Sequence, residues 1–431
     1  MSRPMSMGAA LMGLVAALSL VAPDAQAQDV LIRNATVHTA TSQGTLQGTD
    51  VLVRNGRISA IGRGLNGGNA PVLDAQGKPL TPALFAGIND IGVEEVSGES
   101  ATVDHRLSLG SGNKDMQVRP EFDVTTAYNP ESVLIPVARV EGFGWTMLAA
   151  SPNSGGSFIG GQGGAVRFDG SLDPIGPKVL FIALGGDGAN LTGGSRAGQW
   201  MILDQLIDEV RGRIPQDSQF ALLTPAGRAT LAKYFGGGGR VAVGVHRASD
   251  IRRVLRWAKA RNVRIALVGA SEGWKVADGI AAAKVPVFVD TLANLPGDFD
   301  QIGATLENAA RMSNAGVDVA FTLSDSGSHY ARKMRQVAGN AVSYGMPWEA
   351  ALAGLTRVPA QTFGVGDEVG GIAVGRRADL ALWTGDPLDV AHTATQVWMG
   401  GRATPMKSRQ TELRDRYLHR NETALPPAYS R

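Results

Sequence analysis

The chain changes character at one stretch, Thr81-Pro82-Ala83-Leu84-Phe85-Ala86-Gly87-Ile88-Asn89-Asp90. Before this stretch, apolar residues alternate with polar ones in short runs, and Asn55-Gly56 offers a tight turn, as is typical of antiparallel strands. After it, apolar runs alternate with helical segments, which is the βα pattern of a parallel sheet. We therefore predict that a β-domain ends at residue 81 and that an α/β domain begins at residue 82.

The far end of the chain repeats the strand pattern of the near end. Short apolar runs with turn signals occupy residues 30–37 and 51–58, and again residues 378–383 and 396–402. One split domain could combine both sets of strands. The predicted organisation is a signal peptide (1–27), a composite β-sandwich (28–81 with 366–406), a barrel (82–365) and a charged C-terminal tail (407–431).

The middle of the chain carries many βα units in succession. Examples are the strand and helix patterns at residues 179–184 and 199–213, 240–245 and 249–261, and 264–268 and 273–283. So many units in one run favour a closed (β/α)₈ TIM-like barrel over an open doubly wound sheet. The predicted fold class is therefore α/β, with a small β-sandwich domain formed by both chain ends.

Composition narrows the classes of partner. The chain has 431 residues, 44% apolar residues and a formal net charge of +2, with lysine and arginine spread along its length. No basic stripe for nucleic acid is present, so we expect a small-molecule ligand or substrate, or a protein partner. The sequence is also compatible with a homo-oligomer.

The first 27 residues have the pattern of a secretory signal. Arg3 precedes an apolar run at residues 8–22, and Ala25-Gln26-Ala27 is a small-x-small cleavage site. The apolar run is shorter than the roughly 20 residues that a membrane span requires, so we predict cleavage and no stable membrane span. With no cysteine in the chain, disulfides and a lipid-anchored cysteine are excluded. We therefore expect the mature protein to be exported, either to the periplasm or to the medium.

Two motifs indicate a family. Residues 55–62 (NGRISAIG) and 370–383 (GGIAVGRRADLALW), at the two ends of a split sandwich around a barrel, resemble the amidohydrolase superfamily, in particular its imidazolonepropionase-like branch. The resemblance implies a hydrolase of carbon–nitrogen bonds other than peptide bonds, in amides or cyclic amides. It also implies one or two divalent metals at the barrel mouth, held by two histidines after strand one, histidines after strands five and six, and an aspartate after strand eight.

The resemblance places other residues at the histidine positions. They fall on Ile88, Asp90, Gly244 and Gly269, and the aspartate position falls on Asp325. A shift of two residues would make His246 a ligand; otherwise it is a strand-end histidine bonded to backbone. Asp325 and His246 are thus the catalytic candidates, and Asp325, His246 and Asp90 the candidates for a weak or vestigial metal site. We expect no metal at full occupancy, and a zinc-like divalent metal if the protein is active.

Alternatives to a metal-dependent hydrolase remain. One is a non-catalytic binding or assembly protein on the same barrel, a pseudoenzyme. Another is a serine hydrolase, since Gly269-Ala270-Ser271-Glu272-Gly273 matches G-x-S-x-G, with Asp325 and then His329 or His392 later in the chain. The simpler interpretation of Ser271 is the N-cap of a helix. For the glycine-rich residues 160–164, the family resemblance implies a loop near the barrel mouth.

Overall fold

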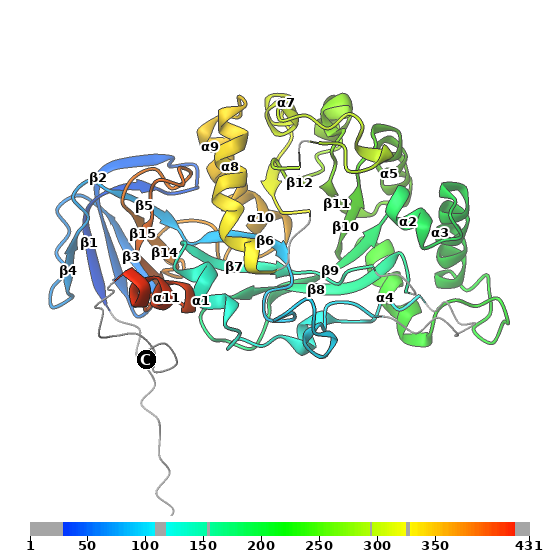
Figure 1. The fold of residues 1–431 in the computed structure, drawn as a ribbon, viewed down its shortest axis with the longest axis horizontal. Helices are drawn as coiled ribbons and strands as arrows, with labels where there is room; N and C mark the ends of the chain where they lie inside the picture. The colour runs from blue at the N-terminus through cyan, green and yellow to red at the C-terminus, as the bar shows by residue number, and fades with distance from the viewer. Residues whose placement is uncertain (1–28, 108–117, 153–155, 294, 325–327, 419–431) are drawn as a thin grey trace, which may run out of the picture.

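The computed structural model describes residues 29–107, 118–152, 156–293, 295–324 and 328–418. The predicted signal peptide and Asp325 lie outside these residues. Two eight-stranded sheets organise the molecule. One lies at the left of Figure 1, and the other, with the helices around it, fills the centre and the right.

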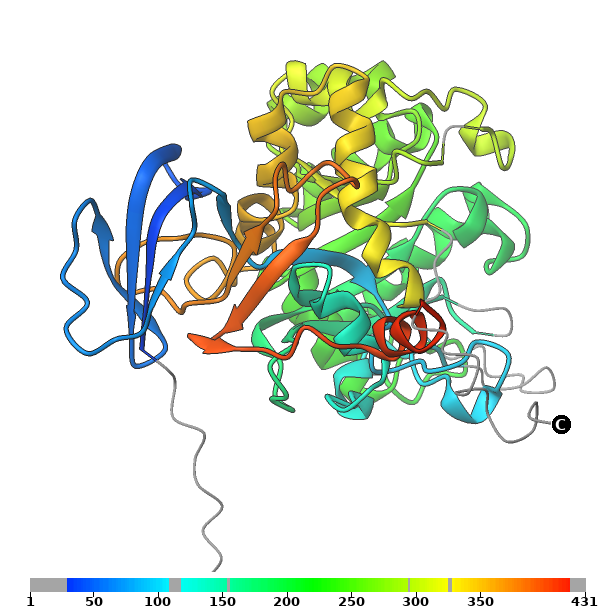
Figure 2. The same cartoon turned by 60° about the vertical axis from the view of Figure 1, so that its left-hand side comes forward.

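Both ends of the chain contribute strands to the first sheet, called here the composite sheet. Its strands are β1 (Val30–His38), β2 (Thr45–Arg54), β3 (Arg57–Gly62), β4 (Val72–Asp74), β5 (Pro79–Pro82), β14 (Leu380–Trp383), β15 (Ala394–Met399) and β16 (Arg402–Ala403). β5 joins the two sets, because it pairs in parallel with β1 and antiparallel with β14. Figure 2 shows the orange C-terminal strands between the blue N-terminal strands and the barrel.

The hairpin between β2 and β3 turns where the sequence predicts. Arg54 pairs with Arg57 across a two-residue turn. Asn55 and Gly56 have φ values of 48° and 75°. These left-handed conformations suit asparagine and glycine, which explains why this dipeptide makes the turn.

The second sheet, the barrel sheet, confirms the predicted TIM-like barrel. Its strands are β6 (Leu84–Asn89), β7 (Phe143–Leu148), β8 (Ile159–Arg167), β9 (Ile175–Ala183), β10 (Arg240–Val245), β11 (Arg264–Gly269), β12 (Val287–Val289) and β13 (Val319–Phe321). Thr322, just after β13, donates a hydrogen bond to the carbonyl of Ile88 in β6 at 3.2 Å, so the first and last strands approach each other. Buried aromatic rings fill the interior; those of Phe288 and Phe363 stack at 5.0 Å.

One strand of the barrel sheet departs from the predicted parallel pattern. β8 runs antiparallel to both β7 and β9, and it contains the glycine-rich residues that were predicted to form a loop. A Cβ atom at Gly163 would lie 1.8 Å from the carbonyl oxygen of Leu148, and one at Gly160 would lie 2.6 Å from that of Ala150. The glycines therefore allow a close backbone approach, a use of glycine in strands that propensity alone does not reveal.

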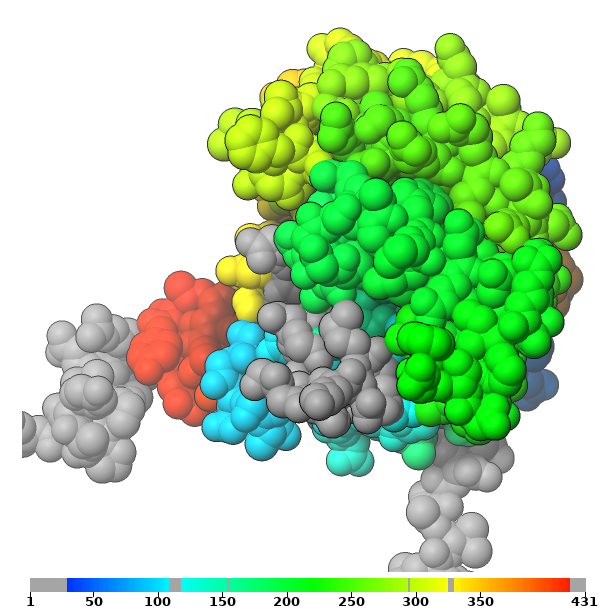
Figure 3. All heavy atoms as spheres, turned by 90° about the vertical axis from the view of Figure 1, so that its right-hand side faces the viewer, coloured from blue at the N-terminus to red at the C-terminus, as the bar shows by residue number. Residues whose placement is uncertain are grey.

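Helices cover the outside of the barrel sheet. They are α1 (Leu134–Arg139), α2 (Gly186–Asn190), α3 (Arg196–Val210), α4 (Pro225–Phe235), α5 (Ala248–Arg261), α6 (Ala277–Ala282), α7 (Asn308–Asn314), α8 (Met334–Ser343), α9 (Trp348–Gly354) and α10 (Arg357–Thr362), with α11 (Arg409–Leu418) near the C-terminus. Figure 3 shows the end of the molecule that lies far from the composite sheet. Green segments, among them α3, form much of the surface at that end. Within the described ranges, no helix has the length and apolar character needed to cross a membrane.

A network of charged side chains joins the composite sheet to the barrel. Asp169, after β8, accepts a hydrogen bond from Arg377 at 2.6 Å, and Arg377 also bonds Asp379 beside β14 at 2.9 Å. Asp169 is nearly buried and also pairs with Arg167 at 3.3 Å. Burial opposes its ionisation, but the bonds from Ser171 and the two arginines hold the pKa of Asp169 below its usual range.

Candidate functional site

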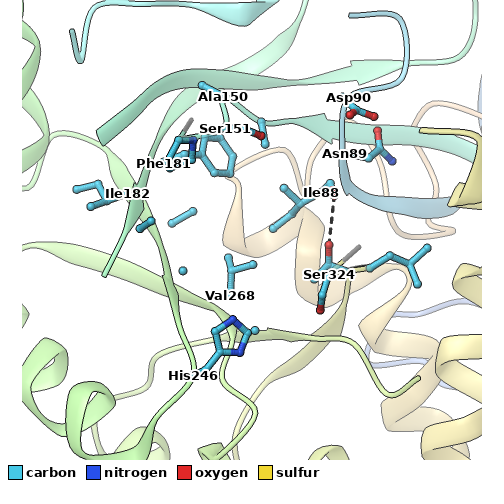
Figure 4. Close-up of a pocket in the computed structure, with 18 residues that line it drawn as sticks. Ile88, Asn89, Asp90, Ala150, Ser151, Phe181, Ile182, His246, Val268 and Ser324 are labelled. Carbon is cyan, nitrogen blue, oxygen red and sulfur yellow. Dashed lines mark hydrogen bonds between the residues drawn. The ribbon is translucent and has the colours of Figure 1, made fainter. Parts of the chain in front are cut away.

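A pocket opens at the C-terminal ends of the barrel strands, where TIM barrels place their active sites. Its volume is about 280 Å³, close to the lower end of the range for small-molecule sites. We call it the mouth pocket. Figure 4 shows residues from opposite sides facing it, among them Ile88 in β6 and His246 after β10.

The four positions that the resemblance assigns to metal-binding histidines all border this one pocket. Ile88, Asp90, Gly244 and Gly269 are among its lining residues. Isoleucine offers no lone pair and glycine has no side chain, so Asp90 is the one member of this set with a ligand atom. These residues do not fit the family's metal centre, and we derive no chemical step through a metal at these positions.

His246 lines the mouth pocket with its imidazole packed over Gly269. A Cβ atom at residue 269 would lie 2.4 Å from Cε1 of His246. The φ angle of Gly269 is +88°, a conformation that favours glycine. The imidazole of His246 thus fills space beside the position that the resemblance gives to the strand-six histidine.

A hydrogen bond fixes the imidazole of His246. Its Nδ1 lies 2.8 Å from Oγ of Ser271, so the bond goes to a side chain and not to the backbone, as one interpretation had it. Ser271 is only 8% exposed. Glu272, and not Ser271, occupies the N-cap position of the following 3₁₀ helix, η3 (Gly273–Val276), so the predicted N-cap role of Ser271 is wrong. The Ser271 hydroxyl instead contacts the imidazole of His246.

The histidines predicted for a serine triad lie elsewhere. His392 contacts Thr384 at 3.4 Å, and His329 packs against Tyr330 with ring centroids 4.2 Å apart. The histidine that touches Ser271 is His246, which precedes it in the chain. The order nucleophile, acid, histidine predicted for the G-x-S-x-G motif therefore does not describe this pair.

Asp90 belongs to a second group of chemically active side chains beside the mouth pocket. Nδ1 of His105 lies 3.3 Å from Oδ2 of Asp90 and 3.5 Å from Oε2 of Glu94. Among the described residues, these three form the one cluster of at least three His, Cys, Asp or Glu side chains whose ligand atoms lie within 4.8 Å of one another. His246 is not part of it, so the predicted grouping of His246 with Asp90 is not seen there. We call Asp90, Glu94 and His105 the carboxylate–histidine cluster.

Burial favours the neutral form of His105. The side chain is 8% exposed, and burial together with the positive charge of Arg106 lowers the pKa of His105 to about 4, although the charge of Asp104 opposes this shift. The neutral imidazole is the form that binds metals. Sequence reasoning predicted Asp90 but missed Glu94 and His105. Their contact arises because the loop after β6 folds back on itself, and no regular sequence spacing predicts it.

Comparison with known proteins gives a consistent family. A model of the amidohydrolase family matches residues 270–405. An imidazolonepropionase of Maricaulis maris is 35% identical over 130 residues, which are 29% of this chain and 31% of that protein. An amidohydrolase of Hapsidospora irregularis, tasK, is 44% identical over 66 residues, 15% of this chain and 7% of that protein. The matches thus span less than a third of the length of these curated relatives.

Solved structures agree on the fold. An amidohydrolase from Thermotoga maritima superposes with a TM-score of 0.74 at 24% identity, covering 87% of this chain and 99% of that one. A molinate hydrolase superposes with a TM-score of 0.53 at 15% identity, covering 94% and 99%. At these identities the likeness supports the barrel and the adjoining β-rich domain.

Proposed function

Because the chain belongs to the amidohydrolase superfamily, in its imidazolonepropionase-like branch, we propose that it is an exported hydrolase acting on a carbon–nitrogen bond, other than a peptide bond, in a small molecule. The observation that carries this proposal is the mouth pocket, which has one fixed imidazole on its wall. Its volume of about 280 Å³ suits a small amide or cyclic amide.

His246 is the proposed acid–base group. When the Ser271 hydroxyl donates to Nδ1, the proton of the neutral imidazole resides on Nε2, which can then donate to a carbonyl oxygen or a leaving nitrogen. When the Nδ1 proton is donated to Ser271, Nε2 can instead accept a proton from water. Ser271 thus acts as a positioning residue that couples the tautomer of His246 to the direction of one hydrogen bond. Asp325 is the second proposed proton acceptor.

A screen of small amides and cyclic amides tests hydrolysis. Product formation is followed by NMR, with the new carboxylate and amine as signals. General acid–base groups typically contribute about 10²–10⁴-fold to rate, so His246→Gln should lower kcat/KM by that factor. The matched control is His392→Gln. The His392 side chain contacts Thr384 and does not line the mouth pocket. Equal rates in both variants would rule out His246 as the acid–base group.

A second candidate function is ligand binding without turnover. The observation that favours it is the lack of ligand atoms at Ile88, Gly244 and Gly269, where the family resemblance expects histidines. Saturation-transfer NMR with the same compounds distinguishes the candidates. Binding that His246→Gln weakens, with no product after prolonged incubation, would favour the binding protein.

Export is the remaining part of the proposal, and it is supported by the signal pattern of residues 1–27. Mass spectrometry of the protein produced in a bacterial host should find a mature N-terminus near Gln28 in the periplasmic fraction or the medium. A full-length chain retained in the cytoplasm would contradict export.

A further inference from the structure

We propose that Asp90, Glu94 and His105 bind a divalent metal ion at the edge of the mouth pocket. Two ligand atoms about 2.1 Å from a metal, at the tetrahedral angle, lie about 3.4 Å apart. Nδ1 of His105 lies 3.3 Å from the Asp90 oxygen and 3.5 Å from the Glu94 oxygen. The imidazole nitrogen is therefore already spaced from each carboxylate oxygen as two ligands of one ion would be, and ligand atoms of all three residues lie within 4.8 Å of one another.

The backbone holds the three side chains in place. The N–H groups of Val93 and Glu94 both donate to the carbonyl of Asp90 at 2.9 Å, which makes a tight turn after β6. Glu94 forms an antiparallel bridge with Val103, and this bridge brings the following His105 back toward the turn. The carbonyl of His105 accepts a hydrogen bond from Ser151, a pocket residue, at 2.9 Å. A site organised in this way requires little rearrangement to bind an ion.

Burial supplies an independent reason for a ligand. His105 is 7% exposed and Glu94 5%. Nδ1 of His105 is fully buried and makes no hydrogen bond in the described part of the chain, despite its closeness to both carboxylates. Buried polar atoms in folded proteins nearly always have a partner. A cation bound among the three groups would give this imidazole nitrogen a partner.

The donor set selects the kind of ion. One imidazole nitrogen and two carboxylate oxygens suit first-row divalent metals such as Zn²⁺ or Mn²⁺. Three protein ligands with an open position are also the arrangement of zinc sites that act in catalysis. Since Asp90 lines the mouth pocket, the open position would lie near a small molecule bound in that pocket.

This site differs from the metal centre that the family resemblance implies. That centre would use the positions of Ile88, Asp90, Gly244 and Gly269. The proposed site shares only Asp90 with it, because Glu94 and His105 belong to the loop after β6 and occupy none of the family's ligand positions. Any use of the ion in hydrolysis rests on the proposed function. Metal binding is measured without turnover, so an experiment that disproves the metal site is distinguishable from one that disproves the proposed hydrolysis.

Manganese provides a direct test. The purified full chain is stripped with a chelator, desalted and titrated with Mn²⁺, and the free ion is measured by electron paramagnetic resonance. We expect one ion per chain, competition by Zn²⁺, and nitrogen modulation from His105 in the pulsed spectrum. Loss of an outer-shell partner already costs metal sites about 10–100-fold in affinity, so His105→Gln should cost more than about 100-fold and abolish the modulation.

Three variants complete the test. Asp104→Asn, which removes an exposed carboxylate from the same loop, should leave binding unchanged. Glu94→Gln should weaken binding and keep the nitrogen modulation, which separates loss of a ligand from misfolding of the loop. His246→Gln should bind like the unaltered chain. The proposal is overturned if the unaltered chain binds no stoichiometric ion, or if binding survives His105→Gln and is lost in His246→Gln.

Discussion

The imidazole of His246 lies directly over the Cα atom of Gly269, so close that a methyl group there would come within 2.4 Å of Cε1. The two residues form one unit of the pocket wall, in which the absence of a side chain on β11 makes room for the histidine that follows β10. A histidine restored at residue 269 would therefore collide with His246 instead of adding a metal ligand.

Gly269→Ala should destabilise the protein and displace His246. The added methyl group meets the imidazole, and the φ angle of +88° is unfavourable for alanine. Strained backbone positions cost about 1–3 kcal/mol each, and we expect a loss of this size in the free energy of unfolding measured with urea. Gly279→Ala is the control: it lies in α6, where an added methyl group meets nothing within 4 Å. It should be neutral or stabilise by roughly 0.5–1 kcal/mol.

Ser271 should not react with a fluorophosphonate probe. Its hydroxyl touches His246 at 2.8 Å, but the side chain is nearly buried and does not line the mouth pocket. Labelling that disappears in Ser271→Ala would instead establish a serine hydrolase. If Ser271 only positions the imidazole, Ser271→Ala should shift the pH profile of turnover while the melting temperature changes little.

Asp169→Asn should weaken the junction between the composite sheet and the barrel. The carboxylate bonds Arg377 and Arg167 and is nearly buried, so we expect a loss of about 2–3 kcal/mol in the free energy of unfolding at pH 7. Because the pKa of Asp169 is lowered in the folded state, its stabilising contribution is present above the unfolded pKa of about 4 and is lost as pH falls further. The difference between the two proteins should therefore shrink in urea titrations below pH 4.

Glu368→Gln is the matched control for that junction. Glu368 pairs with Arg167 at 3.3 Å but its side chain is 50% exposed, where ion pairs contribute little. We expect a change under about 1 kcal/mol at any pH. A loss as large as that of Asp169→Asn would show that the network acts as a whole and that Asp169 has no special role.

Gly163→Ala should disrupt β8. The added methyl group would overlap the carbonyl oxygen of Leu148 on β7, and backbone cannot move aside as a flexible side chain can. We expect poor soluble expression or a melting temperature lowered by more than about 4 °C. Gly98→Ala, where an added methyl group meets nothing within 4 Å, should behave like the unaltered chain. Normal stability of Gly163→Ala would refute the close approach of β8 to β7.

The sequence predicted those parts of the fold that depend on interactions between neighbouring residues. Asn55-Gly56 makes its turn because both residues tolerate positive φ. The helical pattern at residues 249–261 predicted α5, whose buried residues include Ile251, Val254 and Ala258. The repeated βα pattern predicted the barrel. In each case a few neighbouring residues contain the signal.

Features that depend on distant contacts were missed. The family resemblance placed residues 160–164 in a loop, but they form a strand because the backbones of β7 and β8 approach within the space that a side chain would take. His105 joins Asp90 and Glu94 only because its loop returns to the turn after β6. The pairing of His246 with Ser271 depends on two adjacent strands. None of these contacts has a spacing that could be read along the chain.

The pairing of β5 with β14 has a consequence for the order in which this protein folds. Nε1 of Trp383 donates to Oγ1 of Thr81 at 2.9 Å, across 302 residues of chain. The composite sheet therefore cannot be completed until nearly the whole polypeptide has emerged from the ribosome. Contacts between such distant segments slow folding, so the nascent chain spends longer without its final sheet.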